Sequence, residues 1–202
     1  MYKRQAEKAY LIGFRLGDLN VRMDLPTSKT IQVRCGTTIP AQVDLIRGLF
    51  EPFGHVNTRK GTIGETQVEC HVDMSFDFLL PKEDRVPDWA KDDDTCFWAF
   101  LAGYMDAEGY IGLKKTRSGR SAIVEIASCD IGILSDLLAG LRDRGIVCPN
   151  LYLKTRAGTV DRRGTRTNRD FYILRVIRKA SLDQLFQHVS PFLKHGDKQR
   201  CV

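Results

Sequence analysis

The chain has 202 residues, of which 43% are hydrophobic and 28% are charged. This length is enough for one or two compact domains with a buried core, and the composition is that of an ordinary globular protein. No apolar stretch approaches the length that spans a bilayer, and the lysine-flanked N-terminus lacks the apolar core of a signal peptide. We therefore expect no membrane association, and a location in the cytosol or, if the gene is organellar, in an organelle matrix.

The six cysteines, at positions 35, 70, 96, 129, 148 and 201, include no C-x-x-C pair. This spacing argues against a zinc site or a disulfide scaffold and favours reduced thiols. The net charge of +6 is uneven, because residues 1–90 hold 12 basic and 12 acidic side chains whereas residues 91–202 hold 19 and 13. A basic second half suggests a polyanionic partner, most simply nucleic acid, although modest positive charge is also common on solvated surfaces.

The first eighty residues predict seven elements. An apolar helical run, Leu11–Asp18, precedes residues whose apolar–polar alternation has the period of a strand. An amphipathic helix follows at Pro40–Phe53, with proline near its start and Gly54 just past its end. The other expected elements are a hairpin of 21–25 with 31–33, a hairpin of 55–60 with 66–73, and a short helix at 75–80.

The same order returns after Pro81–Asp94, a segment rich in proline and charge. The second copy begins with the apolar helical run Leu101–Glu108, and its central amphipathic helix is predicted at Asp130–Arg144. Its other expected elements are a hairpin of 111–113 with 122–126, a hairpin of 150–156 with 169–178, and a helix at 180–193. We expect half-domains at 1–80 and 95–202, joined by a linker at 81–94. The fold class is α+β: tandem αββαββα repeats forming two antiparallel four-stranded sheets, with helices on one face.

The two helical runs share one design, in which small residues recur four positions apart. Residues i and i+4 lie on the same helix face, so each run carries a strip that another backbone can approach closely. We expect the two helices to pair through these strips. The residues concerned are Gly13, Gly17, Gly103 and Ala107.

Each run ends in a carboxylate, Asp18 or Glu108, and pairing would bring these side chains together. An acid at a helix C-terminus opposes the helix dipole, and two adjacent acids raise one another's pKa. A divalent cation between them would relieve both penalties. One such helix is usually an ordinary core helix; two copies with the acid at the same offset favour a metal-dependent site.

These residues also carry a family resemblance. Leu101–Gly109 is a near-complete LAGLIDADG motif, and Leu11–Leu19 resembles a degenerate partner. The degenerate copy departs from the pattern at Arg15, Leu16 and Leu19. The chain resembles the single-chain, two-motif LAGLIDADG homing endonucleases, whose repeat fold is also αββαββα and whose paired sheets form a DNA-binding saddle. The resemblance implies that Asp18 and Glu108 bind the catalytic metal, with Mg²⁺ or Mn²⁺ as the cofactor.

The family commonly places a basic residue after the last elements of a repeat. The segment Pro191–Arg200 resembles that region, which makes Lys194 and Lys198 the candidates for catalytic assistance. His195 is a weaker candidate of the same kind, and Leu80-Pro-Lys82 is the shorter counterpart in the first half. A solvated C-terminal tail is the alternative interpretation.

The strand alternation predicts which side chains face away from the helices. Mixed donors and acceptors on a rigid sheet suit base-edge contacts in the major groove, although an ordinary solvated sheet face has the same pattern. The candidate reading residues are Arg22, Asp24, Gln32, Arg34, Gln67, Glu69 and His71 in the first half, and Lys114 and Thr116 in the second. A flexible arginine-rich loop in the last hairpin is expected to contact phosphates. Its arginines are Arg156, Arg162, Arg163, Arg166 and Arg169.

The leading hypothesis is a monomeric, metal-dependent endonuclease that makes a staggered double-strand break in a long asymmetric DNA site. The alternatives are an RNA-splicing maturase that binds intron RNA, and a DNA- or RNA-binding protein that does not cleave, because fold alone does not assign function. Retention of both acids argues against a purely binding role. A metal-dependent hydrolase of small substrates is a distant third.

Overall fold

The first seven elements form one repeat, and the computed structural model describes residues 5–62, 64–116, 119–161 and 164–202 of the chain. The predicted order of helix, hairpin, helix, hairpin and terminal helix is confirmed. The elements are α1 Gln5–Asp18, β1 Asn20–Arg22, β2 Thr30–Thr37, α2 Pro40–Phe50, β3 Val56–Lys60, β4 Thr66–Asp73 and the 3₁₀ helix η1 Met74–Leu79.

The second repeat has the same order. Its elements are α4 Asp94–Glu108, β5 Gly109–Thr116, β6 Gly119–Ser128, α5 Ile131–Asp143, β7 Tyr152–Thr155, β8 Phe171–Val176 and α6 Lys179–Val189. Two short helices were not predicted: α3 Asp88–Lys91 lies between the repeats, and α7 Gly196–Gln199 lies near the end of the chain. Among the described residues, no helix combines the length and apolarity needed to cross a bilayer.

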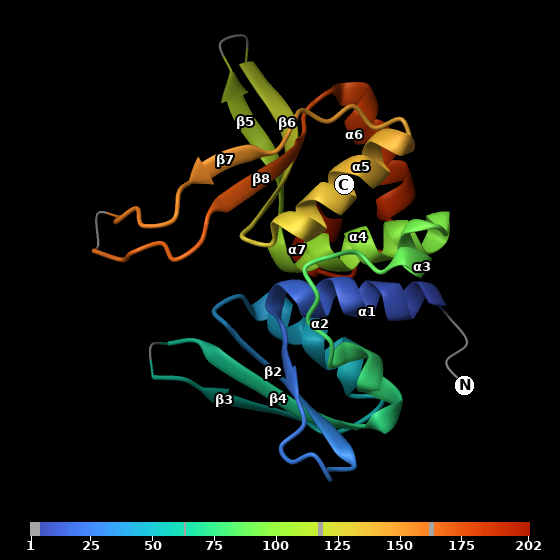
Figure 1. The fold of residues 1–202 in the computed structure, drawn as a ribbon, viewed down its shortest axis with the longest axis vertical. Coiled ribbons are helices and arrows are strands. Elements are labelled where there is room, and N and C mark those ends of the chain that lie inside the picture. The colour runs from blue at the N-terminus through green and yellow to red at the C-terminus, as the bar shows by residue number, and fades with distance from the viewer. Residues whose placement is uncertain (1–4, 63, 117–118, 162–163) are drawn as a thin grey trace.

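Each repeat contributes one antiparallel four-stranded sheet, in the orders β1-β2-β4-β3 and β5-β6-β8-β7. The two central strands of each sheet therefore come from different hairpins, as in Arg34 of β2 opposite Glu69 of β4. Figure 1 shows α1 and α4 side by side between the two sheets, with the other helices on the same side of their sheets. The predicted α+β class, with helices on one face of two sheets, is confirmed.

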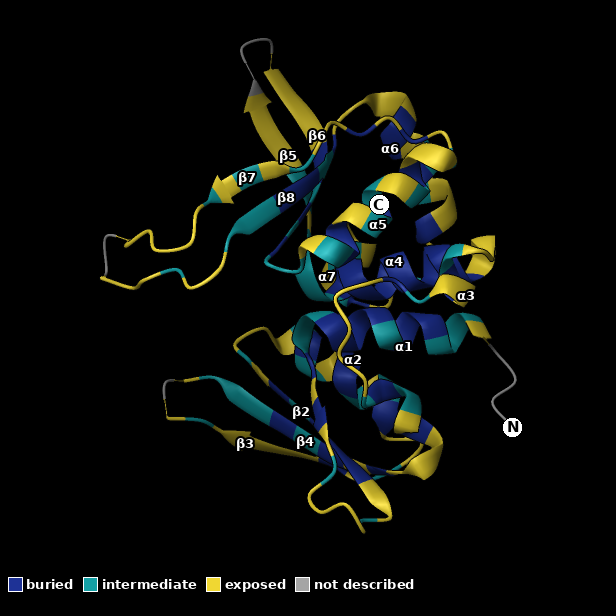
Figure 2. Cartoon of the chain, viewed as in Figure 1, coloured by how far each residue is buried: buried dark blue, intermediate teal, exposed yellow. Residues whose placement is uncertain are grey.

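The contact between α1 and α4 depends on the absence of side chains at three glycines. A Cβ atom at Gly13 would overlap the carbonyl oxygen of Phe100, and one at Gly103 would overlap that of Tyr10. Near the C-terminal ends of the helices, a Cβ at Gly17 would overlap the Cβ of Ala107. Backbone lies directly against backbone, which explains why most of α4 and the middle of α1 are buried, dark blue in Figure 2.

The segment expected to be a linker is attached to the second repeat by hydrogen bonds. The carboxylate of Asp84 accepts from the backbone N–H groups of Gly132 and Ile133, each at 3.0 Å, in the first turn of α5. The Asp136 carboxylate accepts from the N–H of Val86 at 2.9 Å. These contacts hold the connection across the N-terminal half of α5, where negative charge and free N–H groups are complementary.

One local prediction was wrong. β1 ends at Arg22 rather than near residue 25, because Leu25 and Ser28 close a turn: the Ser28 N–H donates to the Leu25 carbonyl at 2.9 Å, and the Ser28 hydroxyl accepts from the Leu25 N–H at 3.0 Å. In the last hairpin, backbone hydrogen bonds from Gly158 to Thr167 and from Thr167 to Thr159 continue the ladder beyond β7 and β8.

Candidate active site and nucleic-acid interface

Asp18 and Glu108 are the last residues of α1 and α4, so the helix contact brings the two carboxylates to one place. Burial, together with the nearby charges of Asp18 and Asp130, raises the pKa of Glu108 to about 7. Burial also raises the pKa of Asp18, against the lowering effects of Lys198, Gln42 and His195. Gln42, near the start of α2, donates a 2.5 Å hydrogen bond to the Asp18 carboxylate. The site therefore concentrates partly buried negative charge.

The structure distinguishes between the two candidate lysines. Lys198 donates to the carbonyl oxygens of Met105 and, at 2.7 Å, Asp106, in the last turn of α4. Burial lowers the pKa of Lys198, and the charges of Asp106, Asp18 and Glu108 oppose that effect. The ammonium of Lys194 instead lies 4.8 Å from the centre of the Tyr10 ring. Lys198, and not Lys194, belongs to the group of charges around the two acids.

A cavity of about 320 Å³ opens beside Asp18 and Lys198. His195 lines it and is only 3% exposed, and its Nδ1 atom has no hydrogen-bond partner among the described residues. Burial, followed by the charge of Lys198, lowers the pKa of His195, which favours the neutral imidazole. Lys82, in the segment between the repeats, lies close enough to Glu108 for its charge to oppose the burial that raises the pKa of that acid.

Asp106 was missed as a functional residue. It is completely buried, and its Oδ2 atom accepts from the Tyr10 hydroxyl at 2.6 Å and from the N–H groups of Lys194 at 2.7 Å and His195 at 3.1 Å. The carboxylate thereby anchors the segment that carries Lys198. Its position as the first acid of the complete motif was a signal, but its partners lie about ninety residues away in sequence.

The first repeat anchors the equivalent segment with the opposite chemistry. Leu16 stands where the second repeat has Asp106, and the neighbouring Arg15 donates from Nε to the Leu79 carbonyl at 2.7 Å and from Nη2 to the Leu80 carbonyl at 3.4 Å. The two departures from the motif are thus related. A carboxylate that accepts from N–H groups is replaced by a guanidinium that donates to carbonyl groups.

The donor set fits a hard divalent cation. Asp18 and Glu108 offer oxygen ligands, whereas the described residues contain no cluster of three or more His, Cys, Asp and Glu side chains placed to hold a metal. Mg²⁺ is commonly bound through one or two carboxylates, with water and substrate phosphate supplying the other ligands. Burial, and after it the charges of Asp18 and Asp130, raise the pKa of Glu108, and a cation bound beside this carboxylate would oppose both effects.

The predicted reading residues of the first sheet do lie on one face, but they bind one another. Arg22 donates to Gln32 at 2.9 Å, and Gln32 donates to Glu69 at 3.1 Å. Glu69 also pairs with Arg34 at 3.3 Å. Gln32, expected to be exposed, is only 7% exposed because these neighbours cover it.

The remaining candidates extend this network on both sides. Asp24 lies 3.7 Å from both Arg22 and His71, and Gln67 packs over Gly36 and donates to Glu65 at 3.0 Å. The register places further polar residues in the same rows, and these were missed because the pairing of distant strands cannot be read from alternation alone. They are Asn20, Asn57 and Arg59.

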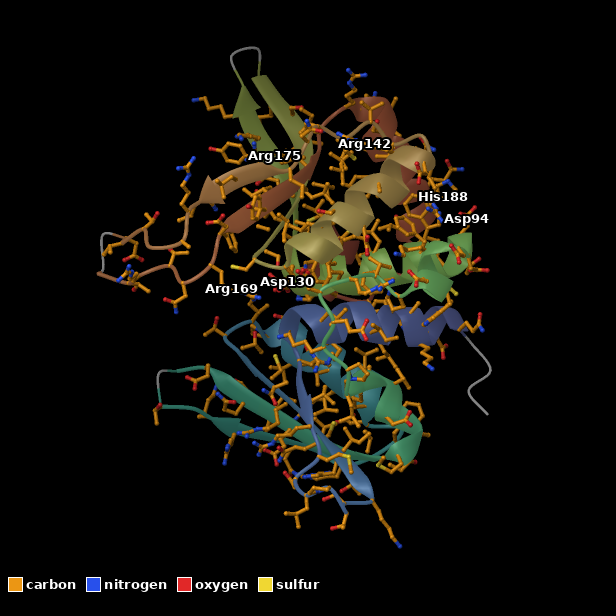
Figure 3. The ribbon with its side chains drawn as sticks, in the orientation of Figure 1. Asp94, Asp130, Arg142, Arg169, Arg175 and His188 are labelled. Carbon is orange, nitrogen blue, oxygen red and sulfur yellow. The ribbon has the colours of Figure 1, made fainter. Side chains whose placement is uncertain are left out.

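The second sheet presents a different face. Lys114 is exposed on β5 and pairs in register with Ser121, and the side chain of Thr116 lies outside the described residues. The residues missed here are Tyr110, which continues the same alternation toward α4, and the Glu125–Arg175 ion pair of 2.6 Å. Figure 3 shows Arg175 on β8, among the strands of this sheet.

The arginines of the last hairpin differ in their surroundings. Arg156 lies at the base of the loop, and Arg166 forms a β-bridge with Val160 further out. Arg169 pairs with Asp130, the residue before α5, at 3.6 Å, and Figure 3 labels both near the base of the hairpin. Arg162 and Arg163 lie outside the described residues. The hairpin carries exposed positive charge beyond the edge of the second sheet.

No protein-family model and no curated protein sequence matches the chain. Solved structures do match it. One, of I-DmoI in complex with DNA and Ca, has a TM-score of 0.60 and 15% identity over 92% of this chain and 89% of that one. The homing endonuclease I-WcaI bound to its DNA recognition sequence has a TM-score of 0.58 and 15% identity, over 97% and 86% of the two chains.

The N-terminal LAGLIDADG domain of DUF199/WhiA is equally similar, with a TM-score of 0.57 and 14% identity over 99% of this chain and 88% of that one. These matches agree with the repeat order, the two sheets and the helix contact described above. The chain has the LAGLIDADG fold, which it shares with homing endonucleases and with WhiA.

Proposed function

We propose that this protein is a site-specific, divalent-metal-dependent endonuclease that cuts both strands of a long asymmetric DNA site, as an intron-homing enzyme does. The observation that supports the proposal most strongly is the doubled acid. Asp18 and Glu108 end two equivalent helices that pack against each other, and the partly buried ammonium of Lys198 lies nearby. Two acids related by an internal pseudo-two-fold axis suit two scissile phosphates on opposite strands, so one monomer is sufficient.

In this proposal Asp18 and Glu108 hold Mg²⁺ or Mn²⁺. When bound there, the metal lowers the pKa of an attacking water and stabilises charge on the phosphate oxygens. Gln42 fixes the orientation of the Asp18 carboxylate through its 2.5 Å hydrogen bond. Lys198 supplies positive charge where negative charge develops on the phosphate, and Asp106 holds the segment that positions Lys198.

The open faces of the two sheets supply the DNA-binding surface. Arg34, Gln32 and Glu69 already have fixed side-chain geometry, which base-edge recognition requires. Lys114 and the arginines of the last hairpin supply charge for phosphates. The similarity to I-DmoI in complex with DNA and to I-WcaI bound to its DNA recognition sequence supports this use of the fold.

A second candidate function is binding without cleavage, because the similarity to the WhiA domain is as strong as the similarity to the endonucleases. Binding of intron RNA, as in a splicing maturase, is a variant of this alternative. Neither function requires two acids at the helix ends, where their mutual repulsion and burial have an energetic cost.

The test begins with a random library of DNA duplexes, from which the full-length protein selects bound sequences in EDTA. The selected duplex is then incubated with Mg²⁺ or Mn²⁺, and the ends are sequenced. We expect staggered cleavage by the natural protein. Asp18→Asn and Glu108→Gln are each expected to slow cleavage by at least about 100-fold, because each removes charge that stabilises the transition state. Both variants should bind the duplex normally.

Asp44→Asn is the matched control, because Asp44 is an exposed acid on α2 outside this site. It should cleave as the natural protein does. Full cleavage by the Asp18→Asn, Glu108→Gln double variant would contradict the proposed roles of the acids. Specific binding of a duplex that neither metal ion causes to be cut would favour the non-cleaving alternative.

A further inference from the structure

The open face of the second sheet carries buried apolar residues that are separate from the core. Ile123 and Ile173 are buried, yet neither belongs to the core beneath the helices. Val124 and Leu174, the next residues along the same strands, do belong to that core. Since successive side chains of a strand point to opposite faces, Ile123 and Ile173 are buried on the face proposed above to bind DNA.

Each of these isoleucines has a tyrosine beside it on the same face. The ring of Tyr110 lies over Gly112, because a Cβ at Gly112 would come within 2.6 Å of the Tyr110 Cζ atom, and Gly112 is the register partner of Ile123. Tyr152 is the register partner of Ile173. Both tyrosines remain about half exposed. The open face therefore presents aromatic surface at two places to whatever covers the sheet.

A polar pair lies between the two isoleucines and holds one of the tyrosines. The Arg175 guanidinium lies 5.0 Å from the centre of the Tyr152 ring and pairs with Glu125 at 2.6 Å, in the row of the sheet between Ile123 and Ile173. An arginine held by an acid and a ring face has fewer conformations open to it than a free surface arginine. The ring of Tyr152 is thus supported by Arg175, and that of Tyr110 by the backbone of Gly112.

The equivalent positions of the first sheet are polar. At the ninety-residue offset of the two motifs, Asn20 and Arg22 stand where the second repeat has Tyr110 and Gly112. Arg22 is part of the hydrogen-bonded network with Gln32 and Asp24. The two open faces thus differ: the first carries a hydrogen-bonded polar network, whereas the second adds apolar and aromatic surface beside Lys114 and the Glu125–Arg175 pair.

From this difference, and resting on the proposed function, we infer that the second sheet recognises the 5-methyl groups of thymine in its half-site. In the major groove the thymine methyl is the one apolar group by which a natural base pair differs from the others, and apolar side chains contact it. The first sheet instead reads its half-site through hydrogen bonds. Tyr110 also lines the cavity beside Asp18 and Lys198, so the methyl-reading surface begins next to the cleavage centre.

The experiment uses the duplex selected from the random library, with binding measured in EDTA. The Arg34→Ala variant identifies the half-site of the first sheet, because base preferences should change there. Deoxyuridine then replaces thymidine in one half-site at a time, which removes methyl groups and leaves every hydrogen-bonding edge intact. We expect affinity to fall about fourfold for each contacted methyl in the second half-site, the effect of removing one buried methyl group. The same replacement in the first half-site should change affinity less than about twofold, since hydrogen-bonded recognition does not use the methyl group.

Tyr110→Ala and Tyr110→Phe form a matched pair. Tyr110→Ala should bind the thymidine and deoxyuridine duplexes equally at the positions it contacts, whereas Tyr110→Phe keeps the ring and should keep the discrimination. Tyr110 is half exposed and outside the core, so both variants are expected to fold. Sensitivity to deoxyuridine that is equal in the two half-sites, or absent from the second, would overturn the inference while leaving cleavage and the proposed function intact.

Two other outcomes would overturn the inference. If an unstructured RNA binds more tightly than any selected duplex and loses affinity in Tyr110→Ala, the rings are stacking platforms for single strands. If no duplex is retained at all, the proposed function fails together with the inference. The duplex cleavage assay therefore separates a failure of methyl recognition from a failure of the whole proposal.

Discussion

The hydroxyl of Tyr10, in the first repeat, donates a 2.6 Å hydrogen bond to the buried carboxylate of Asp106 in the second. The same carboxylate oxygen accepts from the backbone of Lys194 and His195. One contact thus joins the helix pair, the two repeats and the segment that carries Lys198. Burial raises the pKa of Tyr10, and the charge of Asp106 raises it further, so the phenol stays protonated and remains a donor.

Tyr10→Phe is expected to reduce the free energy of unfolding by about 1–3 kcal/mol, because a buried charged acceptor loses one of its donors. Urea denaturation measures the change. Tyr172→Phe is the matched control, since its hydroxyl donates to Asp170 at 3.2 Å near the surface, and it should cost less than about 0.5 kcal/mol. Equal losses in the two variants would mean that the Tyr10–Asp106 hydrogen bond contributes no more to the free energy of unfolding than a hydrogen bond near the surface.

Gly103→Ala should destabilise the protein by at least about 2 kcal/mol, even though alanine is the better helix former. The added methyl would overlap the Tyr10 carbonyl oxygen and lie 2.9 Å from the Phe14 nitrogen. Because both of these atoms belong to the backbone of α1, the two helices would have to move apart to make room for the methyl. Gly48→Ala tests the opposite case, because a Cβ at this helical glycine meets nothing within 4 Å. It should stabilise the protein by roughly 0.5–1 kcal/mol. Thermal denaturation gives the melting temperature of both variants. If Gly103→Ala raised the melting temperature as Gly48→Ala is expected to, the helix contact would have room for a methyl group.

Stability without divalent metal should fall as pH rises through the window set by Glu108. Below its ordinary pKa of 4.5 the carboxyl is protonated in both states; between 4.5 and about 7 the unfolded chain has lost this proton while the folded chain retains it. The folded state is therefore disfavoured progressively, by about 3 kcal/mol over the window. The Glu108→Gln variant has no carboxyl to ionise at this position and should not lose stability in this way. Its free energy of unfolding, relative to that of the natural protein, should therefore increase from about pH 5 to about pH 8. A constant difference would show that Glu108 titrates normally.

Lys198→Met should slow cleavage of the selected duplex by about 10–100-fold with little change in affinity, because the ammonium acts where phosphate charge develops. Lys194→Met removes a lysine four residues earlier that lies over the Tyr10 ring, and it should leave the rate nearly unchanged. Single-turnover rates at saturating protein make the comparison independent of binding. A rate loss in Lys194→Met alone would reverse the assignment of the two lysines.

Replacement of Arg34 should change preference at particular base pairs, each good hydrogen-bonded pair being worth roughly 1–3 kcal/mol of discrimination. Joint replacement of Arg156 and Arg166 should weaken binding to all duplexes alike. It should also flatten the dependence of log K on log salt by about 0.9 for each phosphate that the variant no longer neutralises. Affinities measured across a salt series distinguish the two behaviours. If the hairpin variant changed sequence preference and kept its salt slope, the roles of sheet and hairpin would be exchanged.

Much of the fold was predictable because the repeat is local in sequence. Period-two and helical patterns located nearly all of the elements, and the duplicated small-residue strip predicted where Gly13 and Gly103 meet. The same strip predicted that Asp18 and Glu108 come close together, because each acid directly follows the last small residue of its helix. What alternation cannot supply is the pairing of strands from different hairpins, so the covering of Gln32 by Arg22 and Glu69 was missed.

The site was less predictable where a side chain depends on a distant backbone. The role of Asp106 requires the chain near Lys194 to return beside α4, which no local pattern encodes. Tyr110 could have been predicted from the sequence, because it lies four residues before Lys114 and the two-residue period of a strand places both on the same face. Arg15 was noted only as a departure from the motif, whereas in the structure its guanidinium donates to the Leu79 and Leu80 carbonyl groups and so takes the anchoring role that Asp106 has in the second repeat.

The opposite chemistry of Arg15 and Asp106 has a consequence for how the two repeats can pair. Two copies of the second repeat, paired as a dimer, would place Phe100 at the position of Tyr10 and leave Asp106 without its phenolic donor. Two copies of the first would have Leu16 in place of that acid, so the buried phenol would have no acceptor. Neither repeat therefore carries both residues of this contact. Each half requires the other as its partner, and neither can be exchanged for a second copy of itself.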